Sequence, residues 1–247
     1  MKEQFERTAL LLGAQAMERL AQSRVAVFGL GGVGGYAAEA LIRSGLGAID
    51  LIDSDRVSLS NLNRQIFATH ETVGQYKVDA AEERLLQIAP DTVIRKLPYF
   101  YCEETDDRFD LSQYDYVIDA IDTVSCKLTL VQRAQAVDTP IISSMGTGNK
   151  MDPAALAVSD ISKTTVCPLA RIMRKELRKR GIKHLKVVYS KELPLPAVDR
   201  TPSGELPPEG RRAIPGSNAF VPCSAGLLIA AEVVRDLTGV RGNGLGI

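Results

Sequence analysis

A glycine-rich segment early in the chain has the residue types and the spacing that bind a nucleotide phosphate. Gly29, Gly31 and Gly34 fit the pattern G-x-G-x-x-G, and Gly32 lies between them. Glycines at this spacing permit a tight turn and a close approach of the backbone to a phosphate, and a following helix adds free N–H groups. Asp53 ends the next apolar run, where a carboxylate accepts hydrogen bonds from both ribose hydroxyls. By itself, this pattern favours NAD or FAD over ATP.

The polar residues that follow Asp53 change this interpretation in favour of ATP. Residues 53–67 bring several of them beside the predicted nucleotide site: Asp55, Asn61, Asn63, Arg64 and Gln65. Arg64 and Lys77 carry the charge that neutralises a triphosphate, and Asp122 has the carboxylate that Mg²⁺ prefers. Such groups assist attack on the α-phosphorus, because charge builds up on the bridging oxygen of the departing pyrophosphate. The sequence therefore predicts ATP and Mg²⁺ as cofactors and a reaction that forms an adenylate.

The spacing of apolar residues predicts the elements that hold these groups in place. A strand is predicted at 24–28, directly before the glycines, a helix at 34–44, and a second strand at 48–52. Short β-branched runs of this kind are typical of buried strands, and the helix has one apolar face. The unit is β-α-β, so its two strands are expected to be parallel and to end at the same edge of a sheet.

The same alternation continues along the chain. Further strands are predicted at 92–97, 114–120 and 140–144, and helices at 77–88 and 125–136. This rhythm predicts an α/β fold with a doubly wound, Rossmann-like and mostly parallel sheet, which binds ligands at the carboxyl ends of its strands. The chain is long enough for one large domain with a substantial core, so a single domain over residues 1–247 is expected.

Within this domain, residues 1–150 are expected to form the nucleotide-binding core and residues 151–247 an extension that faces the substrate. The extension has a less regular pattern. It is predicted to contain an edge strand at 154–161, a basic helix at 167–180, a strand at 186–190 and a C-terminal helix at 224–237. Residues 191–216 are rich in proline and glycine, so a mobile loop is predicted there, either a lid over the site or a disordered segment.

Taken together, these motifs resemble the ThiF/MoeB/HesA superfamily, the bacterial relatives of ubiquitin-activating enzymes. The matching segments are GLGGVG, the DxDxVxxSNLNRQ run that starts at Asp53, Lys77, and the IDAID segment that ends at Asp122. The resemblance implies that these positions bind ATP, with the metal on Asp122. It also implies a homodimer, because Arg7 matches an arginine that reaches into the neighbouring subunit's site. The residues that it implies as catalytic are Arg7, Arg64, Lys77 and Asp122.

Later segments are similar to one branch of that superfamily, the tRNA threonylcarbamoyladenosine dehydratases (TcdA/CsdL). They are SMGTGNKMDP at 144–153, the basic segment at 160–182, and PGSNAFVPCSAGLLIAAEVVRDL at 215–237. That branch implies ATP-dependent loss of water from threonylcarbamoyladenosine next to the anticodon of tRNA. Adenylation would give the threonyl carboxylate a good leaving group, AMP, and the neighbouring carbamoyl group would then close a ring by intramolecular attack.

The predicted basic helix is the best candidate for a tRNA contact. Its cations include Arg171, Arg174, Lys175, Arg178 and Lys179. Without the resemblance, an ordinary charged helix face explains such a cluster somewhat better. With the resemblance, the cluster predicts salt-sensitive contact with the tRNA backbone.

The composition is that of an ordinary globular protein and limits the other function classes. Hydrophobic residues make up 45%, charged residues 24%, and the formal net charge is +0 at pH 7, so no overall basic field favours nucleic acid. The first residues lack the features of a signal peptide, and no run approaches the roughly 20 apolar residues of a membrane span. A cytoplasmic protein without a membrane partner is predicted.

The cysteine spacing argues against zinc. Cys102, Cys126, Cys167 and Cys223 are far apart and form no CxxC pair, so structural zinc is not expected. Relatives that adenylate a ubiquitin-like sulfur carrier usually hold zinc in two such pairs. Cys167 and Cys223 fit packing residues better than nucleophiles, because no neighbouring acid or base in the sequence would activate a thiolate.

Three alternative functions stay open at this point. The first is adenylation of the C-terminus of a ubiquitin-like sulfur-carrier protein. The second is an NAD-dependent oxidoreductase, which leaves Arg64, Lys77 and Asp122 without a joint purpose. The third is a non-catalytic partner protein that retains the nucleotide pocket. Two further partners are open hypotheses: a monovalent cation that orders the late loop, and a sulfur-transfer system based on a cysteine desulfurase.

Overall fold

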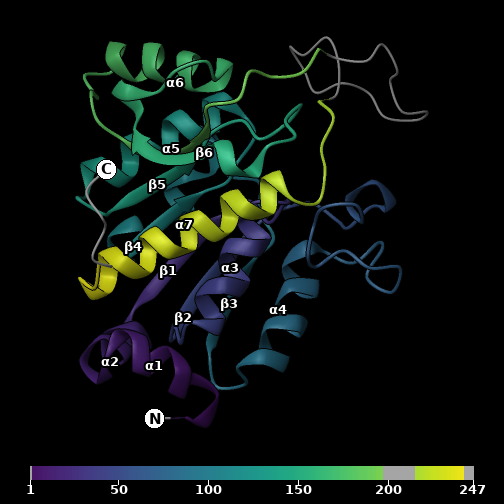
Figure 1. The fold of residues 1–247 in the computed structure, drawn as a ribbon, viewed down its shortest axis with the longest axis vertical. Helices are drawn as coiled ribbons and strands as arrows, with labels where there is room; N and C mark the ends of the chain where they lie inside the picture. Colours follow the sequence, from purple (N-terminus) through teal and green to yellow (C-terminus); the bar gives the residue numbers. More distant parts are fainter. Residues whose placement is uncertain (1, 197–214, 242–247) are drawn as a thin grey trace.

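The computed structural model describes residues 2–196 and 215–241, where one sheet is covered by helices on both faces (Figure 1). Most of the predicted mobile loop at 191–216, namely residues 197–214, lies outside the described residues. No helix in the described ranges is both long and apolar enough to cross a membrane.

In these ranges seven strands form the sheet, in the order β3-β2-β1-β4-β5-β7-β6. Every neighbouring pair is parallel except β6 and β7, which are antiparallel at one edge. The direction of winding changes between β1 and β4, and ligands bind at such switch points. The predicted doubly wound, mostly parallel α/β sheet is confirmed. The strands are β1 Arg24–Phe28, β2 Ala48–Ile52, β3 Val93–Leu97, β4 Tyr116–Asp119, β5 Ile141–Ser144, β6 Leu156–Asp160 and β7 Lys186–Ser190.

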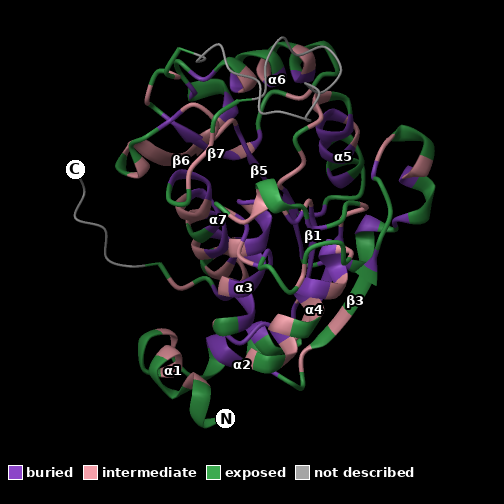
Figure 2. Ribbon diagram, turned by 90° about the vertical axis from the view of Figure 1, so that its right-hand side faces the viewer, coloured by how far each residue is buried: buried purple, intermediate pink, exposed green. Residues whose placement is uncertain are grey.

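Helices cover both faces of the sheet because its central strands are apolar on both sides. All residues of β4 and β5 are buried, as are the last four of β1 and of β2. A parallel sheet of this kind needs a helical layer on each face. One layer contains α3 (Gly34–Arg43), α4 (Lys77–Ile88) and α7 (Val221–Thr238), and the other contains α5 (Val124–Ala136) and α6 (Pro168–Lys179). Figure 2 shows the buried residues gathered between these layers and the sheet.

Two N-terminal helices lie at the edge of the sheet where the strands begin. They are α1 (Glu6–Leu12) and α2 (Ala14–Gln22). No helix boundaries are predicted from the sequence in this part of the chain. Gln4 donates from Nε2 to the carbonyl of Ile88, the last residue of α4, which fixes this end of the chain at the amino edge (Figure 1). Helix α1 has no buried residue.

Short 3-10 helices lie before α1 and in the connections between later elements. They are η1 Glu3–Phe5, η2 Leu59–Asn61, η3 Glu103–Arg108, η4 Leu111–Gln113, η5 Pro153–Ala155 and η6 Ile161–Lys163. Of these, η2 matters most for the site, because it follows the end of β2 and precedes α4.

The C-terminal helix begins three residues earlier than the predicted 224–237. Pro222 lies in its first turn, where a missing N–H costs nothing, so the proline does not delay the helix. The side-chain oxygen of Asn218 accepts hydrogen bonds from the backbone N–H groups of Phe220 and Val221. Residues after 151 therefore supply strands β6 and β7 to the sheet, and they also form α7, the longest helix among the described residues. Helix α7 packs along α3 (Figure 1).

Candidate nucleotide site

The glycine loop joins β1 to α3 and has no room for a side chain at Gly29 or Gly34. Gly29 has φ +91°, and a Cβ there would lie 2.7 Å from the carbonyl oxygen of Ala120. A Cβ on Gly34 would lie only 1.8 Å from the carbonyl oxygen of Gly29. The loop therefore presents bare backbone at the carboxyl edge of the sheet, followed at once by the N-terminus of α3. This geometry suits a phosphate, because N–H groups and the helix dipole both favour an anion.

Asp53 lies just past β2 and is tied to the glycine loop. Its Oδ2 accepts a hydrogen bond from the N–H of Leu30 at 2.7 Å, and its Oδ1 accepts one from the N–H of Asp55 at 2.8 Å. Burial raises the pKa of this carboxyl above its ordinary value, while the nearby Lys77 ammonium and the two N–H groups act in the opposite direction. Asp53 is therefore held beside the loop where it was predicted to bind ribose.

Lys77 opens α4 and places a buried ammonium between two carboxylates. Its Nζ lies 2.7 Å from Oδ2 of Asp55 and 3.6 Å from Oδ2 of Asp53, and its side chain is only 8% exposed. The N–H of Lys77 also donates to the carbonyl of Asp55 at 2.9 Å. The three predicted residues are thus brought together by the structure, although they lie up to 24 positions apart in the chain.

The segment around η2 carries the remaining polar residues of the predicted ATP site. Oδ1 of Asn61 accepts from the N–H of Ser58 at 3.2 Å, so Asn61 shapes the turn. Arg64 donates from Nη1 to the carbonyl of Ser60 at 2.9 Å, and a Cβ on Gly32 would lie 3.3 Å from its Cγ. Arg64 therefore lies against the glycine loop. Gln65 is buried in the same segment.

Asp122 lies on the neighbouring loop, between β4 and α5. Its side chain is exposed, and its Oδ1 accepts a hydrogen bond from Thr123 at 3.3 Å. The backbone of Ala120 in the same loop lies against Gly29, as described above. The structure therefore brings Asp122, the glycine loop, Asp53 and Lys77 to one edge of the sheet.

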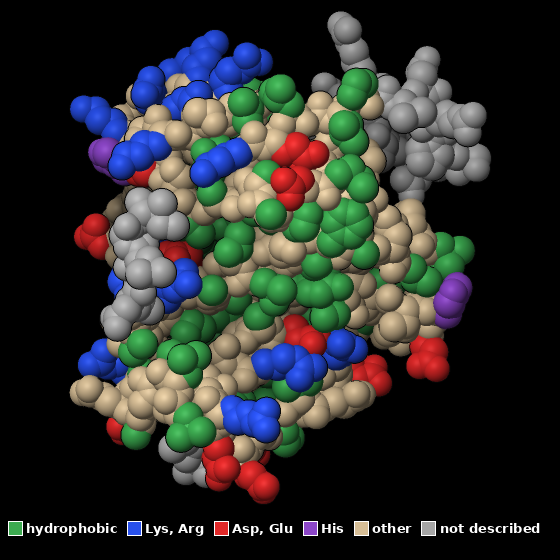
Figure 3. Space-filling model, in the orientation of Figure 1, with side chains coloured by type: hydrophobic (Ala, Val, Ile, Leu, Met, Phe, Trp, Pro, Cys, Tyr) green, Lys and Arg blue, Asp and Glu red, His purple; other side chains and the backbone are tan. Residues whose placement is uncertain are grey.

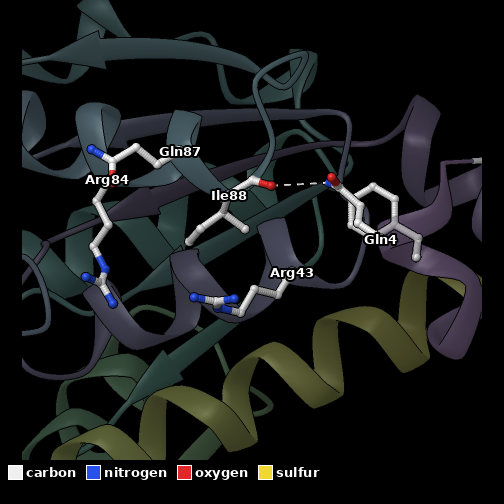
Figure 4. Close-up of a pocket in the computed structure, with 6 residues that line it drawn as sticks. Gln4, Arg43, Arg84, Gln87 and Ile88 are labelled. Carbon is white, nitrogen blue, oxygen red and sulfur yellow. Dashed lines mark hydrogen bonds between the residues drawn. The ribbon is translucent and has the colours of Figure 1, made fainter.

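Arg7 does not join this group within the chain. It is an exposed residue of α1, at the amino edge of the sheet, whereas the glycine loop lies at the carboxyl edge (Figure 1). An open cleft of about 440 Å³ also lies at the amino edge (Figure 4), lined by Gln4, Phe5, Arg43, Arg84, Gln87 and Ile88. Arg43 and Arg84 both pair with Glu39 there. This cleft is separate from the predicted nucleotide site.

The cationic helix is α6, and its positive side chains gather at one end of the molecule (Figure 3). Arg171, Lys175, Arg178 and Lys179 are exposed, and Lys179 pairs with Glu176. Arg174 differs, because its Nη1 donates to the carbonyl of Thr164 at 2.9 Å and to Oγ1 of Thr164 at 2.6 Å. Arg174 therefore fastens α6 to the preceding loop, a role that its place in a basic run does not indicate.

Two features of the site were missed by sequence reasoning. The first is the start of α7, where a Cβ on Gly32 would lie 3.3 Å from Cβ of Pro222, and where Asn63 donates from Nδ2 to the carbonyl of Ser217 at 3.2 Å. The second is a buried pair of Lys127 and Asp119 beneath the loop of Asp122. The G-S-N tripeptide before α7 is a helix-capping signal that would have indicated the first.

Comparison with known proteins identifies the family to which this arrangement belongs. The model of the ThiF family matches residues 5–245. The chain belongs to the ThiF family. The resemblance inferred from the motifs is thereby confirmed.

The tRNA threonylcarbamoyladenosine dehydratase of Bacillus subtilis is 46% identical to this chain over 242 residues, which is 96% of this chain and 95% of that protein. A crystal structure of the Escherichia coli enzyme TcdA with ATP superposes with a TM-score of 0.85 at 31% identity, covering 96% of this chain and 94% of that chain. The molybdopterin-synthase adenylyltransferase of Escherichia coli is 34% identical over 141 residues, 56% of each protein. The dehydratase relatives therefore match a far larger share of the chain.

Proposed function

We propose that this protein is an ATP-dependent tRNA threonylcarbamoyladenosine dehydratase. The observation that carries the proposal is the 46% identity to the Bacillus subtilis enzyme across nearly the full length of both chains. The site supports it, because the predicted ATP-binding residues meet at the carboxyl edge of the sheet. A reaction on tRNA would take place in the cytoplasm, the compartment expected from the sequence.

In this proposal the glycine loop and its surroundings bind ATP. The backbone N–H groups at Gly31–Gly34 and the N-terminus of α3 hold phosphate, and Asp53 accepts hydrogen bonds from the ribose hydroxyls. The cations that neutralise the triphosphate are Arg64 and Lys77, with Asn61 and Gln65 shaping the segment between them. Asp55 holds the Lys77 ammonium in place by the 2.7 Å contact. These roles cover the polar residues selected in the DxDxVxxSNLNRQ run except Asn63, whose Nδ2 donates to the carbonyl of Ser217.

Asp122 is the residue proposed to hold Mg²⁺. Its carboxylate is exposed at the ligand edge of the sheet, beside the glycine loop. The described residues hold no group of three or more carboxylate, histidine or cysteine ligands. One exposed carboxylate beside a phosphate site is how Mg²⁺ is usually bound with ATP, since the ion keeps water and phosphate oxygens as its other ligands. Bound there, Mg²⁺ would neutralise charge on the departing pyrophosphate.

The chemistry that follows needs no nucleophile from the protein. The threonyl carboxylate attacks the α-phosphorus of ATP, and the bond to pyrophosphate breaks. The mixed anhydride then carries AMP as a leaving group, and a nitrogen of the neighbouring carbamoyl group attacks the activated carbonyl carbon. The ring closes, AMP leaves, and the nitrogen loses a proton, so the nucleoside loses one water in total. Intramolecular attack has a large advantage in rate, because the reacting groups are already held together.

A homodimer would complete each site with Arg7 of the partner subunit. Arg7 lies too far around the molecule to serve its own chain, at the opposite edge of the sheet. Leu10 and Leu11 on the same helix are 88% and 79% exposed. Exposed leucines on a short helix favour burial against another protein surface. We therefore assign α1 to the contact between subunits.

The deciding experiment is nucleoside mass spectrometry. The purified protein is incubated with ATP, Mg²⁺ and tRNA in which threonylcarbamoyladenosine has been confirmed beforehand. Loss of one water from that nucleoside is expected, and it should not occur when ATP is omitted. An unchanged nucleoside, together with ATP–pyrophosphate exchange that depends on a ubiquitin-like carrier protein, would instead support the adenylyltransferase alternative.

The exposed cations of α6 are proposed to bind the tRNA backbone, and removing them should weaken binding. Replacing Arg171, Lys175 and Arg178 by glutamine is expected to lower tRNA affinity for all sequences alike. Each lost phosphate contact should also reduce the slope of log K against log[salt] by about one. Affinity measured by filter binding or anisotropy across a salt series tests both effects.

A matched control removes the same amount of charge elsewhere. Lys2, Lys96 and Arg108 are cations away from α6, and their replacement by glutamine should leave the salt slope unchanged. An equal loss of affinity in both triple variants would mean that tRNA responds only to net charge. The assignment of α6 would then be wrong.

A further inference from the structure

A buried ion pair lies directly beneath the loop that carries Asp122. Lys127 and Asp119 have side chains that are 0% exposed, and Nζ of Lys127 lies 2.9 Å from Oδ2 of Asp119. Asp119 is the last residue of β4, and Lys127 lies near the start of α5. Removing two charges from water costs much of what their attraction returns, so a buried pair is a poor general stabiliser. Its position at the ligand edge of the sheet indicates a more specific role.

The other polar contacts of the pair hold the loop between β4 and α5. Lys127 donates from Nζ to the carbonyl of Ile121 at 3.0 Å, and Oδ1 of Asp119 accepts from the N–H of Ile121 at 3.2 Å. Ser143 on β5 donates from Oγ to Oδ2 of Asp119 at 2.5 Å. Both backbone polar groups of Ile121 are therefore bound by the pair, and Ile121 directly precedes Asp122.

The same loop supports the glycine turn from behind. A Cβ on Gly29 would lie 2.7 Å from the carbonyl oxygen of Ala120 and 3.2 Å from the nitrogen of Ile121. The N–H of Ala120 donates to the carbonyl of Phe28 at 2.8 Å. A displacement of the loop at 120–122 would therefore move Asp122 and also disturb the backbone that is expected to bind phosphate.

We propose that Lys127 and Asp119 are positioning residues, which orient Asp122 and the glycine turn for ATP bound with Mg²⁺. The inference rests on the proposed ATP-dependent function and adds to it two residues that contact neither nucleotide nor metal. Groups that orient a metal ligand typically affect metal affinity by about 10- to 100-fold when they are replaced. Here the orientation acts through the backbone of Ile121, which is fixed at both its N–H and its carbonyl.

The test measures ATP affinity by calorimetry, once with Mg²⁺ and once with EDTA. The Lys127→Met protein keeps an unbranched side chain that is one heavy atom shorter, and it loses the charge. It is expected to bind ATP about tenfold or more weakly with Mg²⁺ present, in line with the usual effect of lost orienting contacts. Affinity in EDTA should fall less, since only the Mg²⁺-dependent part requires the carboxylate of Asp122. Unchanged affinity in both media would overturn the proposal.

Two further variants separate positioning from stability. Leu130→Ala removes a fully buried side chain from the same helix and should destabilise the fold without changing the dependence on Mg²⁺. Asp119→Asn combined with Lys127→Met removes both charges and so leaves no unpaired buried charge. This double variant should fold even if the Lys127→Met protein does not. A double variant that binds ATP with the wild-type dependence on Mg²⁺ would show that the pair is only structural. The double variant is instead expected to bind ATP more weakly than the wild type when Mg²⁺ is present.

These measurements use no tRNA, so they are independent of the dehydration assay. Wild-type protein that binds ATP with Mg²⁺ but leaves the tRNA nucleoside unchanged would contradict the proposed substrate. The comparison of the variants at Asp119 and Lys127 would still decide the role of the pair.

Discussion

A protein in which Lys77 is replaced by methionine is expected to lose dehydratase activity by about a hundredfold to a thousandfold. Losses of this size follow when a preorganised group that stabilises developing charge is removed from a site shielded from water. Lys77 is such a group, because its side chain is 8% exposed and its ammonium lies between Asp53 and Asp55. The measurement is the rate of water loss from threonylcarbamoyladenosine in tRNA, at saturating ATP.

The same replacement should change how stability depends on pH. Burial already raises the pKa of Asp53, and the Lys77 ammonium opposes that rise, so the Lys77→Met protein should have a still higher pKa there. A raised folded-state pKa means that the folded state prefers the protonated carboxyl. Stability from this group is present at low pH and is lost as pH rises through the folded-state pKa. The melting-temperature deficit of the variant should therefore shrink as the solution is acidified toward the ordinary Asp value of 3.8.

Lys96→Met is the control for this prediction. Lys96 also pairs with two carboxylates, Asp79 at 2.9 Å and Glu82 at 2.7 Å, but on the outside of the molecule. Exposed pairs contribute little, so this variant should keep both its activity and its stability. Wild-type turnover by the Lys77→Met protein would exclude Lys77 from the reaction.

The sheet was predictable because its signals are local. The run at β1 is short, apolar and β-branched, it leads into glycines, and an apolar helix face follows, so strand and helix are distinguished by length and period alone. The same reasoning located Asp53 and Asp122 at the ends of strands. Parallel strands end at one edge, so two residues far apart in sequence could be expected to meet there.

Residues whose role depends on tertiary packing could not be recognised in this way. Lys127 lies four residues after Thr123 in a helix, where a lysine is ordinarily a solvated charge, and only the loop folded over it buries it. Arg174 belongs to a basic run by sequence, but the loop at Thr164 takes up its guanidinium. Each residue donates both to a side-chain oxygen and to a backbone carbonyl of a loop, and the pattern of residue types indicates neither contact.

The N-terminal helices show the opposite limitation. Leu10 and Leu11 are apolar, so a burial pattern would place them in the core, yet both are largely exposed in the single chain. Two exposed leucines on one short helix suit a contact with another protein surface. The resemblance at Arg7 implies a homodimer, and the unburied leucines lie on the same helix as Arg7.

A mixing experiment tests this shared site directly. The Arg7→Ala and Asp122→Ala proteins should each be nearly inactive as homodimers, because every site then lacks one proposed catalytic group. Mixed after partial unfolding and refolding, or coexpressed with two tags, they should form heterodimers with one intact site. Random pairing makes half of the dimers heterodimers with one working site of two, so about a quarter of wild-type activity should return.

The control pairs two defects that belong to the same site. Lys77→Met and Asp122→Ala both affect residues gathered at one edge of a single chain, so their heterodimers contain no intact site and should stay inactive. Recovery in the first mixture and none in the second requires Arg7 to act across the dimer. If neither mixture recovers although heterodimers are present, Arg7 does not complete the partner's site, and α1 with its exposed leucines must be assigned to some other contact. Arg7 and the glycine loop lie at opposite edges of one sheet, so recovery in the first mixture alone would mean that Arg7 reaches the nucleotide of the partner subunit.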